Sequence, residues 1–141
     1  MGEQVFPEPT VGALIFNDDG KMLLVRSHKW KGKWVMPGGH IELGETAITA
    51  LRREIKEETN LDIDDIRFVC LQEFIFDDAF WKKKHFIFMD YACKAKPGEV
   101  ALDSVGQEFT WVTLKESLDM PVDPYTKHTI EEFLKRFPDG F

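Results

Sequence analysis

Apolar residues recur along the chain in two patterns, one typical of strands and one typical of helices. Five stretches are rich in aliphatic and aromatic residues and have the length of strands. These predicted strands cover residues 10–16, 21–27, 66–76, 84–94 and 109–114. The first two are separated by Asn17-Asp18-Asp19-Gly20, a strong turn signal, so the sequence predicts that they form a hairpin.

Two other stretches follow the helical period. In residues 46–59 the apolar positions fall on one arc of a helix, and they are Ala47, Ile48, Ala50, Leu51 and Ile55. A second amphipathic helix is predicted for residues 124–137, and a short helical turn for residues 115–118. This order of strands and helices predicts an α/β (α+β) protein with a mixed β-sheet between helices.

Three glutamates of the first predicted helix lie on or beside its apolar arc. Glu54 and Glu58 project onto the arc, and Glu57 lies at its edge. Carboxylates at spacings of three and four residues repel one another, and their placement toward a core costs stability. A bound cation would offset this cost, and clusters of oxygen ligands suit Mg²⁺ or Mn²⁺. The alternative is a solvated helix surface on which neighbouring arginines and lysines pair with the acids.

The residues before this helix favour the cation over the solvated surface. Pro37-Gly38-Gly39 predicts a tight turn, because glycine permits positive φ angles and close approach of the backbone to a ligand. The carbonyl groups of such a turn can face the acidic helix and add an oxygen to a metal site. The basic and aromatic segment 28–34 stands just upstream and supplies positive charge for phosphate groups.

The spacing of the glycines, acids and arginine in this region follows a longer pattern. It reads Gly, five residues, Glu, seven residues, then Arg-Glu-aliphatic-any-Glu-Glu-any-Gly-aliphatic, and it matches at Gly39, Glu45, Arg53, Glu54, Ile55, Glu57, Glu58 and Leu61. The pattern resembles the signature of the Nudix hydrolases, which include the MutT-type enzymes. Asn60 stands where that family has glycine. Because asparagine is the next-best residue for a left-handed helix cap, we expect the fold to tolerate this departure.

The resemblance implies an enzyme with a Nudix-type α/β/α sandwich and Mg²⁺ (or Mn²⁺) as its cofactor. By the same resemblance, Glu45 and Arg53 form an ion pair that locks the glycine segment against the helix. The candidate metal ligands are the Gly38 carbonyl and Glu54, Glu57, Glu58 and Glu108. The candidate catalytic residues are Glu45, Arg53, Glu54, Glu57, Glu58 and Glu108.

Glu108 enters this set because the family usually adds one acid from beyond the signature. It stands just before the predicted strand that contains Trp111. Glu99, after Pro97-Gly98, is the competing candidate, and either acid could instead be a solvated loop residue. The general base stays open between Glu54 and the added acid.

Residues that bind the substrate are expected outside the signature, because the signature handles the phosphates and the metal. Aromatic side chains can stack on a nucleobase, although packing in the core is their alternative role. The candidates for substrate binding are Arg26, Trp30, Trp34, Phe80 and Trp81.

We expect a hydrolase of nucleoside diphosphate-linked compounds, and first of all a MutT-like nucleoside triphosphate pyrophosphohydrolase that releases NMP and pyrophosphate. The alternatives are a nucleotide-sugar or dinucleotide diphosphatase and a non-catalytic, nucleotide-sensing regulator. The intact acids argue against the regulator. An isoprenoid-diphosphate isomerase would need a cysteine before the signature, whereas Cys70 and Cys93 follow it. No proline lies between Pro37 and Pro97, which disfavours an ADP-ribose specificity.

The composition sets the remaining expectations. A chain of 141 residues, 43% hydrophobic with 12 phenylalanines, predicts a single domain over residues 1–141. A net charge of −7 argues against a stable nucleic-acid complex and leaves a nucleotide-type small molecule as the expected partner. The absence of a membrane-spanning apolar run and the two unpaired cysteines predict a cytoplasmic protein. A homodimer is left open.

Overall fold

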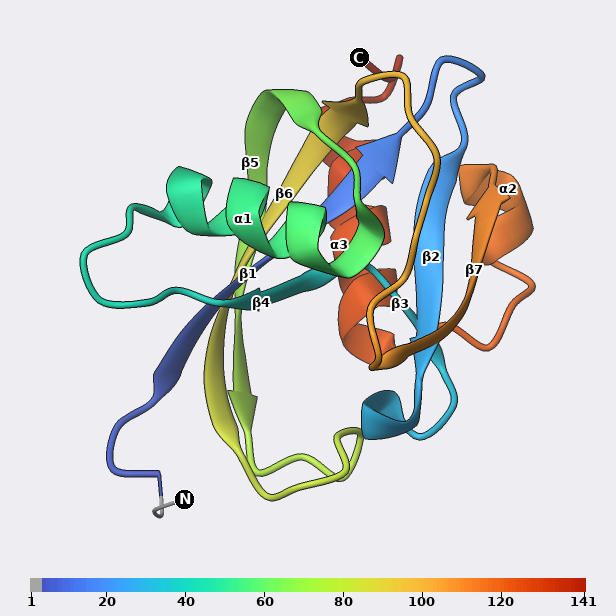
Figure 1. The fold of residues 1–141 in the computed structure, drawn as a ribbon. Coiled ribbons are helices and arrows are strands. Elements are labelled where there is room, and N and C mark those ends of the chain that lie inside the picture. The colour runs from blue at the N-terminus through green and yellow to red at the C-terminus, as the bar shows by residue number, and fades with distance from the viewer. Residues whose placement is uncertain (1–3) are drawn as a thin grey trace.

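The computed structural model of the chain, which describes residues 4–141, contains one seven-stranded mixed sheet between helices (Figure 1). Helix α1 (Ala47–Thr59) covers one face of the sheet and α3 (Pro124–Arg136) covers the other, so the predicted α/β/α sandwich is confirmed. The strands are β1 (Glu8–Phe16), β2 (Met22–Ser27), β3 (Trp34–Val35), β4 (Gly38–His40), β5 (Ile63–Ile75), β6 (His85–Ala95) and β7 (Gly106–Val112). The shorter helical segments are η1 (His28–Trp30) and α2 (Leu114–Ser117).

Strand β1 forms the centre of the sheet, because both of its edges are paired. β6 runs parallel to one edge, from the pair Glu8↔Phe86 to the pair Phe16↔Lys94. Two strands share the other edge: β4 pairs with residues 10–12, and β2 pairs with Phe16. This sharing places β4 in the middle of the sheet, where it contacts α1.

The predicted hairpin is present, but its strands separate soon after the turn. Asn17 N–H donates to the carbonyl of Lys21 at 2.9 Å, and Gly20 has a φ of 74°. The register between β1 and β2 consists of the pair Phe16↔Met22. β2 then pairs with β7 and β3, because β4 occupies the rest of this edge of β1.

The prediction of a tight turn at Pro37-Gly38-Gly39 is wrong, because the two glycines begin β4. They face Gly12 and Val11 in an antiparallel register, and neither has a positive φ. Crowding is the reason for glycine here. A Cβ atom on Gly38 would lie less than 3.0 Å from the carbonyl oxygen of Val11. The close approach of the backbone was therefore predicted correctly, whereas its conformation was not.

Alternation along β1 sends successive side chains to opposite faces of the sheet. Ala13 and Ile15 belong to the same buried cluster as Leu51 of α1. Leu14 belongs to the cluster on the other face, together with Phe133 of α3. Each helix is thus fixed by its own hydrophobic core, and the packing of α1 determines where its glutamates point.

Both ends of α1 have capping residues. At the N-terminus, Thr46 Oγ1 accepts a hydrogen bond from the Thr49 N–H at 3.1 Å. At the C-terminus, Asn60 is left-handed with a φ of 68°, and its N–H donates to the carbonyl of Lys56 at 2.9 Å. The predicted left-handed conformation of Asn60 is confirmed.

The other predicted elements lie within a few residues of the observed ones. β5 begins at Ile63 instead of residue 66, and β7 begins at Gly106 instead of residue 109. The predicted helical turn corresponds to α2. None of the helices within residues 4–141 is long and apolar enough to cross a membrane.

Candidate active site

A cavity of about 300 Å³ lies where β1, β4 and α1 meet the start of α3. Part of its lining is acidic and consists of Glu54, Glu57, Glu58 and Asp103, which we call the acidic wall. Another part is aromatic and consists of Trp30, Phe80, Phe86, Phe88 and Tyr125, which we call the aromatic wall. Gly38, Gly39 and Lys29 also line this cavity.

The buried carboxylate of Glu58 has few hydrogen-bond donors or positive groups beside it to offset its negative charge. Its carboxylate accepts hydrogen bonds from the Gly38 N–H at 3.3 and 3.4 Å, which are long for this type of bond. Burial raises the pKa of Glu58 to about 8, and the charge of Glu54 adds to the effect. Lys29 offsets only a small part of this effect, and a divalent cation beside Glu58 would add positive charge.

Arg53 holds three glutamates of the signature. Its Nε and Nη2 atoms donate to the two carboxylate oxygens of Glu45 at 2.7 and 2.8 Å. Its Nη1 atom donates to Glu54 at 2.9 Å and to Glu57 at 3.2 Å. The hydrogen bonds from Arg53 lower the pKa of Glu45 to about 2. The expected ion pair is therefore present, and it ties the segment before α1 to the helix.

The carboxylate of Glu54 packs against the backbone of Gly39. A Cβ atom on Gly39 would lie less than 3.0 Å from both carboxylate oxygens. The Glu54 side chain is 16% exposed, and burial raises its pKa, whereas the Glu57 side chain is 58% exposed. α1 thus directs Glu54 toward β4 and leaves Glu57 nearer to solvent, in agreement with the helical projection.

The acidic wall has the donor atoms that Mg²⁺ or Mn²⁺ prefers, because all of its side chains offer carboxylate oxygens. The Ala13 N–H donates to the Pro37 carbonyl, and the Ile41 N–H donates to the Pro9 carbonyl. Because hydrogen-bonded and non-hydrogen-bonded pairs alternate along antiparallel strands, Gly12 and Gly38 form a non-hydrogen-bonded pair. The N–H and carbonyl groups of Gly38 therefore point away from β1, and the N–H donates to the Glu58 carboxylate.

Within residues 4–141, no three acidic, histidine or cysteine side chains already form a cation cage. The Arg53 guanidinium already donates hydrogen bonds to the carboxylates of Glu54 and Glu57. A cation at this wall would therefore take over oxygens that now face a guanidinium group. The donor chemistry and the raised pKa of Glu58 fit a divalent ion.

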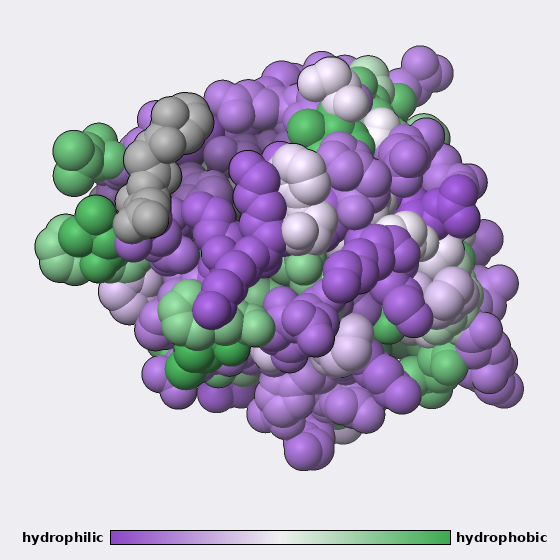
Figure 2. Space-filling model, turned by 90° about the horizontal axis from the view of Figure 1, so that it is seen from below, coloured by the Kyte–Doolittle hydropathy of each residue, from purple (hydrophilic) through white to green (hydrophobic). Residues whose placement is uncertain are grey.

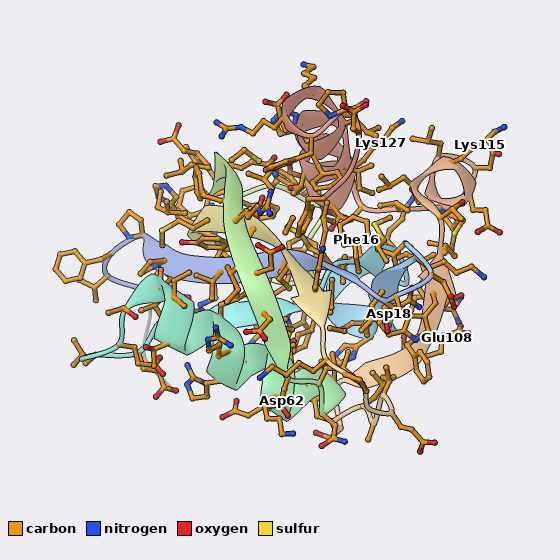
Figure 3. All side chains as sticks on the ribbon, turned by 90° about the horizontal axis from the view of Figure 1, so that it is seen from above. Phe16, Asp18, Asp62, Glu108, Lys115 and Lys127 are labelled. Carbon is orange, nitrogen blue, oxygen red and sulfur yellow. The ribbon has the colours of Figure 1, made fainter. Side chains whose placement is uncertain are left out.

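Asp103 is an acid from beyond the signature that lines the cavity. Its N–H donates to the carbonyl of Glu58 at 3.3 Å, and its charge contributes to the raised pKa of that residue. Glu108 lies on β7, forms an ion pair with Arg26 and is not among the lining residues. Figure 3 shows Glu108 at the rim of the molecule beside β7. Glu99 is exposed beyond the C-terminal end of α1.

The aromatic wall is a packed cluster that continues into a core. Phe86 and Phe88 are 3% and 8% exposed, and their rings stack with centroids 5.5 Å apart. Trp30 contacts Phe80 edge-on at 4.7 Å between ring centroids. The face that carries the β5–β6 loop is mostly hydrophilic, with apolar residues in separate small groups (Figure 2). Phe86 and Phe88 are thus buried at the base of the aromatic wall, whereas Trp30, Phe80 and Tyr125 are half-buried where they line the cavity.

The structure separates the five candidate substrate-binding residues into two groups. Trp30 and Phe80 line the cavity. Arg26, Trp34 and Trp81 are not among its lining residues. The Arg26 guanidinium lies 5.5 Å from the centre of the Trp34 ring, and Trp81 is 46% exposed.

Two buried aspartates line the cavity beside the aromatic wall, and the sequence analysis did not identify them. Asp90 on β6 and Asp123 before α3 are each 2% exposed. Burial raises the pKa of Asp90 to about 6 and that of Asp123 to about 6. A single acid inside the apolar run 84–94 was the available signal for Asp90. Asp123 before Pro124 indicates only a helix cap.

Comparison with known proteins gives concordant results. Residues 6–136 match the family model of the NUDIX domain. Nudix hydrolase 5 from Arabidopsis thaliana is 30% identical over 116 residues, which cover 79% of this chain and 38% of that protein. The nucleoside triphosphatase NudI from Salmonella arizonae is 26% identical over 131 residues, which cover 86% of this chain and 93% of that protein.

Among solved structures, the MutT NUDIX hydrolase from Burkholderia pseudomallei superposes with a TM-score of 0.76 at 28% identity. The match covers 92% of this chain and 98% of that one. The chain spans 38% or less of the length of three curated relatives that it matches.

Proposed function

Because the chain belongs to the Nudix family, whose members hydrolyse diphosphate bonds, we propose that it is a nucleoside triphosphate pyrophosphohydrolase. The reaction would release a nucleoside monophosphate and pyrophosphate, with Mg²⁺ (or Mn²⁺) as cofactor. The similarity to nucleoside triphosphatase NudI, which extends over 93% of that protein, supports this choice of substrate. Substrate and metal are proposals for this chain.

The observation that carries the proposal is that one cavity contains both an acidic wall and an aromatic wall. A nucleotide needs both kinds of surface, because its phosphates require charge neutralisation and its base favours stacking. The cavity volume of about 300 Å³ falls at the lower end of small-molecule sites. A protein that bound only a metal would have no use for the aromatic side of this cavity.

The residues of the acidic wall would each have a part in hydrolysis. When bound, a divalent cation neutralises phosphate charge and lowers the pKa of a water molecule. Glu58, Glu54 and Asp103 are our proposed carboxylate ligands, with the Gly38 carbonyl as a backbone ligand. Their carboxylates would orient that water toward the phosphate.

Other residues would position the substrate and transfer the proton. Lys29, which lines the cavity, would bind a phosphate oxygen. Arg53 would hold Glu54 and Glu57 in place through its hydrogen bonds. Glu54 has a raised pKa and is our candidate to accept the proton of the attacking water, with Asp103 as the alternative. Glu108 would then serve as the partner of Arg26.

The deciding experiment is a substrate panel with Mg²⁺ and product analysis by phosphorus NMR. Nucleoside triphosphates, nucleotide-sugars and dinucleotides belong in one panel, because the last two are the alternative substrates. Monophosphate and pyrophosphate from a triphosphate support the proposal. Orthophosphate release, or turnover of nucleotide-sugars alone, would contradict it.

Glu58→Gln tests the acidic wall in the same assay. The substitution keeps the shape of the side chain and removes a ligand charge, so we expect kcat to fall by about 10²-fold or more. Glu131→Gln is the matched control, since Glu131 is exposed on α3. A binding protein without activity would show no turnover in the wild type either, which would favour the non-catalytic regulator.

Three further expectations stay proposals. We propose that residues 1–141 act as one catalytic domain, because one sheet carries both walls of the cavity. A cytoplasmic location is supported by Cys70 and Cys93, which are free thiols. The oligomeric state is open to measurement by light scattering.

A further inference from the structure

The β5–β6 loop, residues 76–84, is fastened to two other segments beside the cavity. The Trp81 N–H donates to the carbonyl of Lys29 at 2.8 Å, which ties the loop to η1 (Figure 1). The Tyr125 hydroxyl donates to Asp77 Oδ2 at 2.8 Å, which ties the loop to the first turn of α3. Lys29 and Tyr125 both line the cavity, so both attachments join the loop to the cavity lining.

Asp77 also shapes the part of the loop that carries Phe80. Its Oδ1 atom accepts a hydrogen bond from the Ala79 N–H at 2.8 Å, so its two carboxylate oxygens bind different groups. Phe80 follows directly, and its ring belongs to the aromatic wall. The ring contacts Trp30 at 4.7 Å and Phe86 at 5.2 Å between centroids. One carboxylate therefore connects the start of α3 to the backbone that presents Phe80.

The start of this loop has a conformation that its own sequence does not favour. Phe76 has a φ of 53°, which is uncommon for a bulky residue and persists only where the surroundings impose it. Its side chain is 53% exposed, so packing in a core does not impose it. The Phe76 N–H donates to the Lys84 carbonyl at 2.8 Å, which closes the base of the loop. Between its ends, the loop is held by its bonds to Lys29 and Tyr125 and by the packing of Phe80.

The bond between Tyr125 and Asp77 is separate from the packing of the tyrosine ring. The ring contacts Phe74 at 4.9 Å and Phe88 at 5.6 Å between centroids, so it stays in place without its hydroxyl. Burial, together with the bond to Asp77, raises the pKa of Tyr125 to about 12, and the hydroxyl is therefore a donor at neutral pH. Asp77 is exposed and does not line the cavity, so it would not touch a ligand there.

We propose that Tyr125 and Asp77 form a latch that holds the β5–β6 loop against α3 and so keeps Phe80 in the aromatic wall. Both would be positioning residues, which act on the substrate through Phe80. A ring that the loop does not hold must be ordered when the base binds, and this ordering lowers affinity. Neither residue belongs to the acidic wall, so the hydrolytic step would not depend on the latch. The inference rests on the proposed function, because it places the base of a nucleotide against the aromatic wall.

The first test removes the hydroxyl of Tyr125. We expect Tyr125→Phe to raise KM for ATP about three- to tenfold, the range for one net hydrogen bond, with kcat within about twofold of the wild type. Tyr91→Phe is the matched control, because the ring of Tyr91 packs in the other cluster, with Leu51 of α1, and does not line the cavity. An unchanged KM in Tyr125→Phe, or an equal rise in the control, would overturn the proposal.

The second test shows whether the Tyr125 hydroxyl acts through the loop. Serine at position 77 can still cap the Ala79 N–H, whereas its side chain is too short to reach Tyr125. Asp77→Ser should therefore raise KM as much as Tyr125→Phe, and the double variant should be no worse than either single variant. Asp78→Ser is the control, since Asp78 is the adjacent exposed aspartate. A normal KM in Asp77→Ser, or additive effects in the double variant, would overturn the latch.

The third test needs no turnover, because the loop contains Lys82, Lys83 and Lys84, which are sites for trypsin. Cleavage of a folded protein follows the population in which the segment is open. Trypsin should cut Tyr125→Phe at these lysines at least about threefold faster than the wild type, with thermal unfolding unchanged. Equal rates of cutting would contradict the latch. If Tyr125→Phe does not fold, Asp77→Ser, which changes an exposed residue, gives the same comparison.

Failure of the proposed function and failure of this inference give different results. If no triphosphate is hydrolysed, the hydrolase proposal fails, and the latch is then tested by trypsin digestion and by calorimetry with ATP. Faster cutting and weaker ATP binding in Tyr125→Phe would support the latch independently of turnover. If triphosphates are hydrolysed while KM and the rate of cutting are normal in Tyr125→Phe, the hydrolase proposal stands and the latch is wrong.

Discussion

The carboxylate of Glu54 occupies the space in front of Gly39, where a Cβ atom would come within 3.0 Å of its oxygens. The glycine is therefore part of the shape of the acidic wall, although it contributes no side chain. Its neighbour Gly38 is crowded in a different way, because backbone atoms of β1 lie where its Cβ would be. The two adjacent glycines should thus respond differently to the same substitution.

Gly39→Ala should reduce activity more than stability. The added methyl group would push the Glu54 carboxylate out of place, and a flexible side chain can move at modest cost. We expect kcat to fall by about ten- to a hundredfold, with a loss of unfolding free energy of about 1 kcal/mol. Steady-state kinetics and thermal melting of one preparation measure both. A normal kcat would mean that the position of Glu54 is unimportant for turnover.

Gly38→Ala should instead destabilise the fold. Its Cβ would meet the Val11 carbonyl oxygen and the Gly12 Cα, and backbone atoms in a paired strand cannot yield easily. We expect a loss of about 2–3 kcal/mol or more in denaturant unfolding. If Gly38→Ala proves as stable as the wild type, the pairing of β1 with β4 is looser than described.

Phe80 and Trp81 are adjacent aromatic residues with different surroundings. Phe80 lines the cavity and contacts Trp30. Trp81 is 46% exposed, and the centroid of its ring lies 4.6 Å from the Lys82 ammonium. Phe80→Ala should raise KM by about ten- to a hundredfold with little change in kcat, since stacking stabilises ground state and transition state alike. Trp81→Ala should leave KM within about twofold. The reverse order of effects would place Trp81 in the substrate pocket.

The stability contributed by Asp90 should decrease as pH rises. Burial raises the pKa of Asp90 to about 6, above the value of about 3.9 for an unfolded chain, so the folded protein binds this proton more tightly. The contribution is complete below about pH 4 and is lost as pH rises through 6. Asparagine is neutral throughout, so Asp90→Asn should gain stability relative to the wild type between pH 4 and 7, on the order of 2 kcal/mol. Melting curves in EDTA measure this, and a difference that does not vary with pH would contradict the raised pKa.

Asn60→Gly should leave activity and stability almost unchanged. Asn60 has a φ of 68°, a conformation that glycine adopts without strain, and its side chain donates to the Glu99 carbonyl at 3.3 Å, away from the cavity. Asn60→Ala is the informative contrast, because alanine in this conformation should cost about 1 kcal/mol. Equal stability of the two variants would mean that the residue leaves the left-handed conformation when it is replaced.

The local features of the fold could be predicted because they depend on short stretches of sequence. The period of apolar residues located α1, and the same projection placed Glu54 and Glu58 on its inward side. The identity of Asn60 indicated its left-handed cap. The ion pair between Glu45 and Arg53 also followed from the resemblance, since the signature residues keep a fixed spacing.

Features that depend on tertiary pairing could not be predicted in this way. Gly38 and Gly39 have the composition of a turn, and β1 makes them a strand by pairing with them. Asp103 joins the acidic wall because the loop between β6 and β7 folds back on α1, which no local pattern specifies. Asp123 before Pro124 indicated a helix cap, whereas its place in the lining of the cavity follows only from the tertiary fold.

The parallel pairing of β1 with β6 has a consequence for biosynthesis. Glu8 pairs with Phe86, and Phe16 with Lys94, so the central strand must wait for a partner that the ribosome makes much later. At about 5–20 residues per second, this interval lasts several seconds, during which the Leu14 and Ile15 side chains have no completed sheet to pack in. Contacts so distant in sequence also slow folding. The nascent chain should therefore depend on chaperones at this stage more than its small size would indicate.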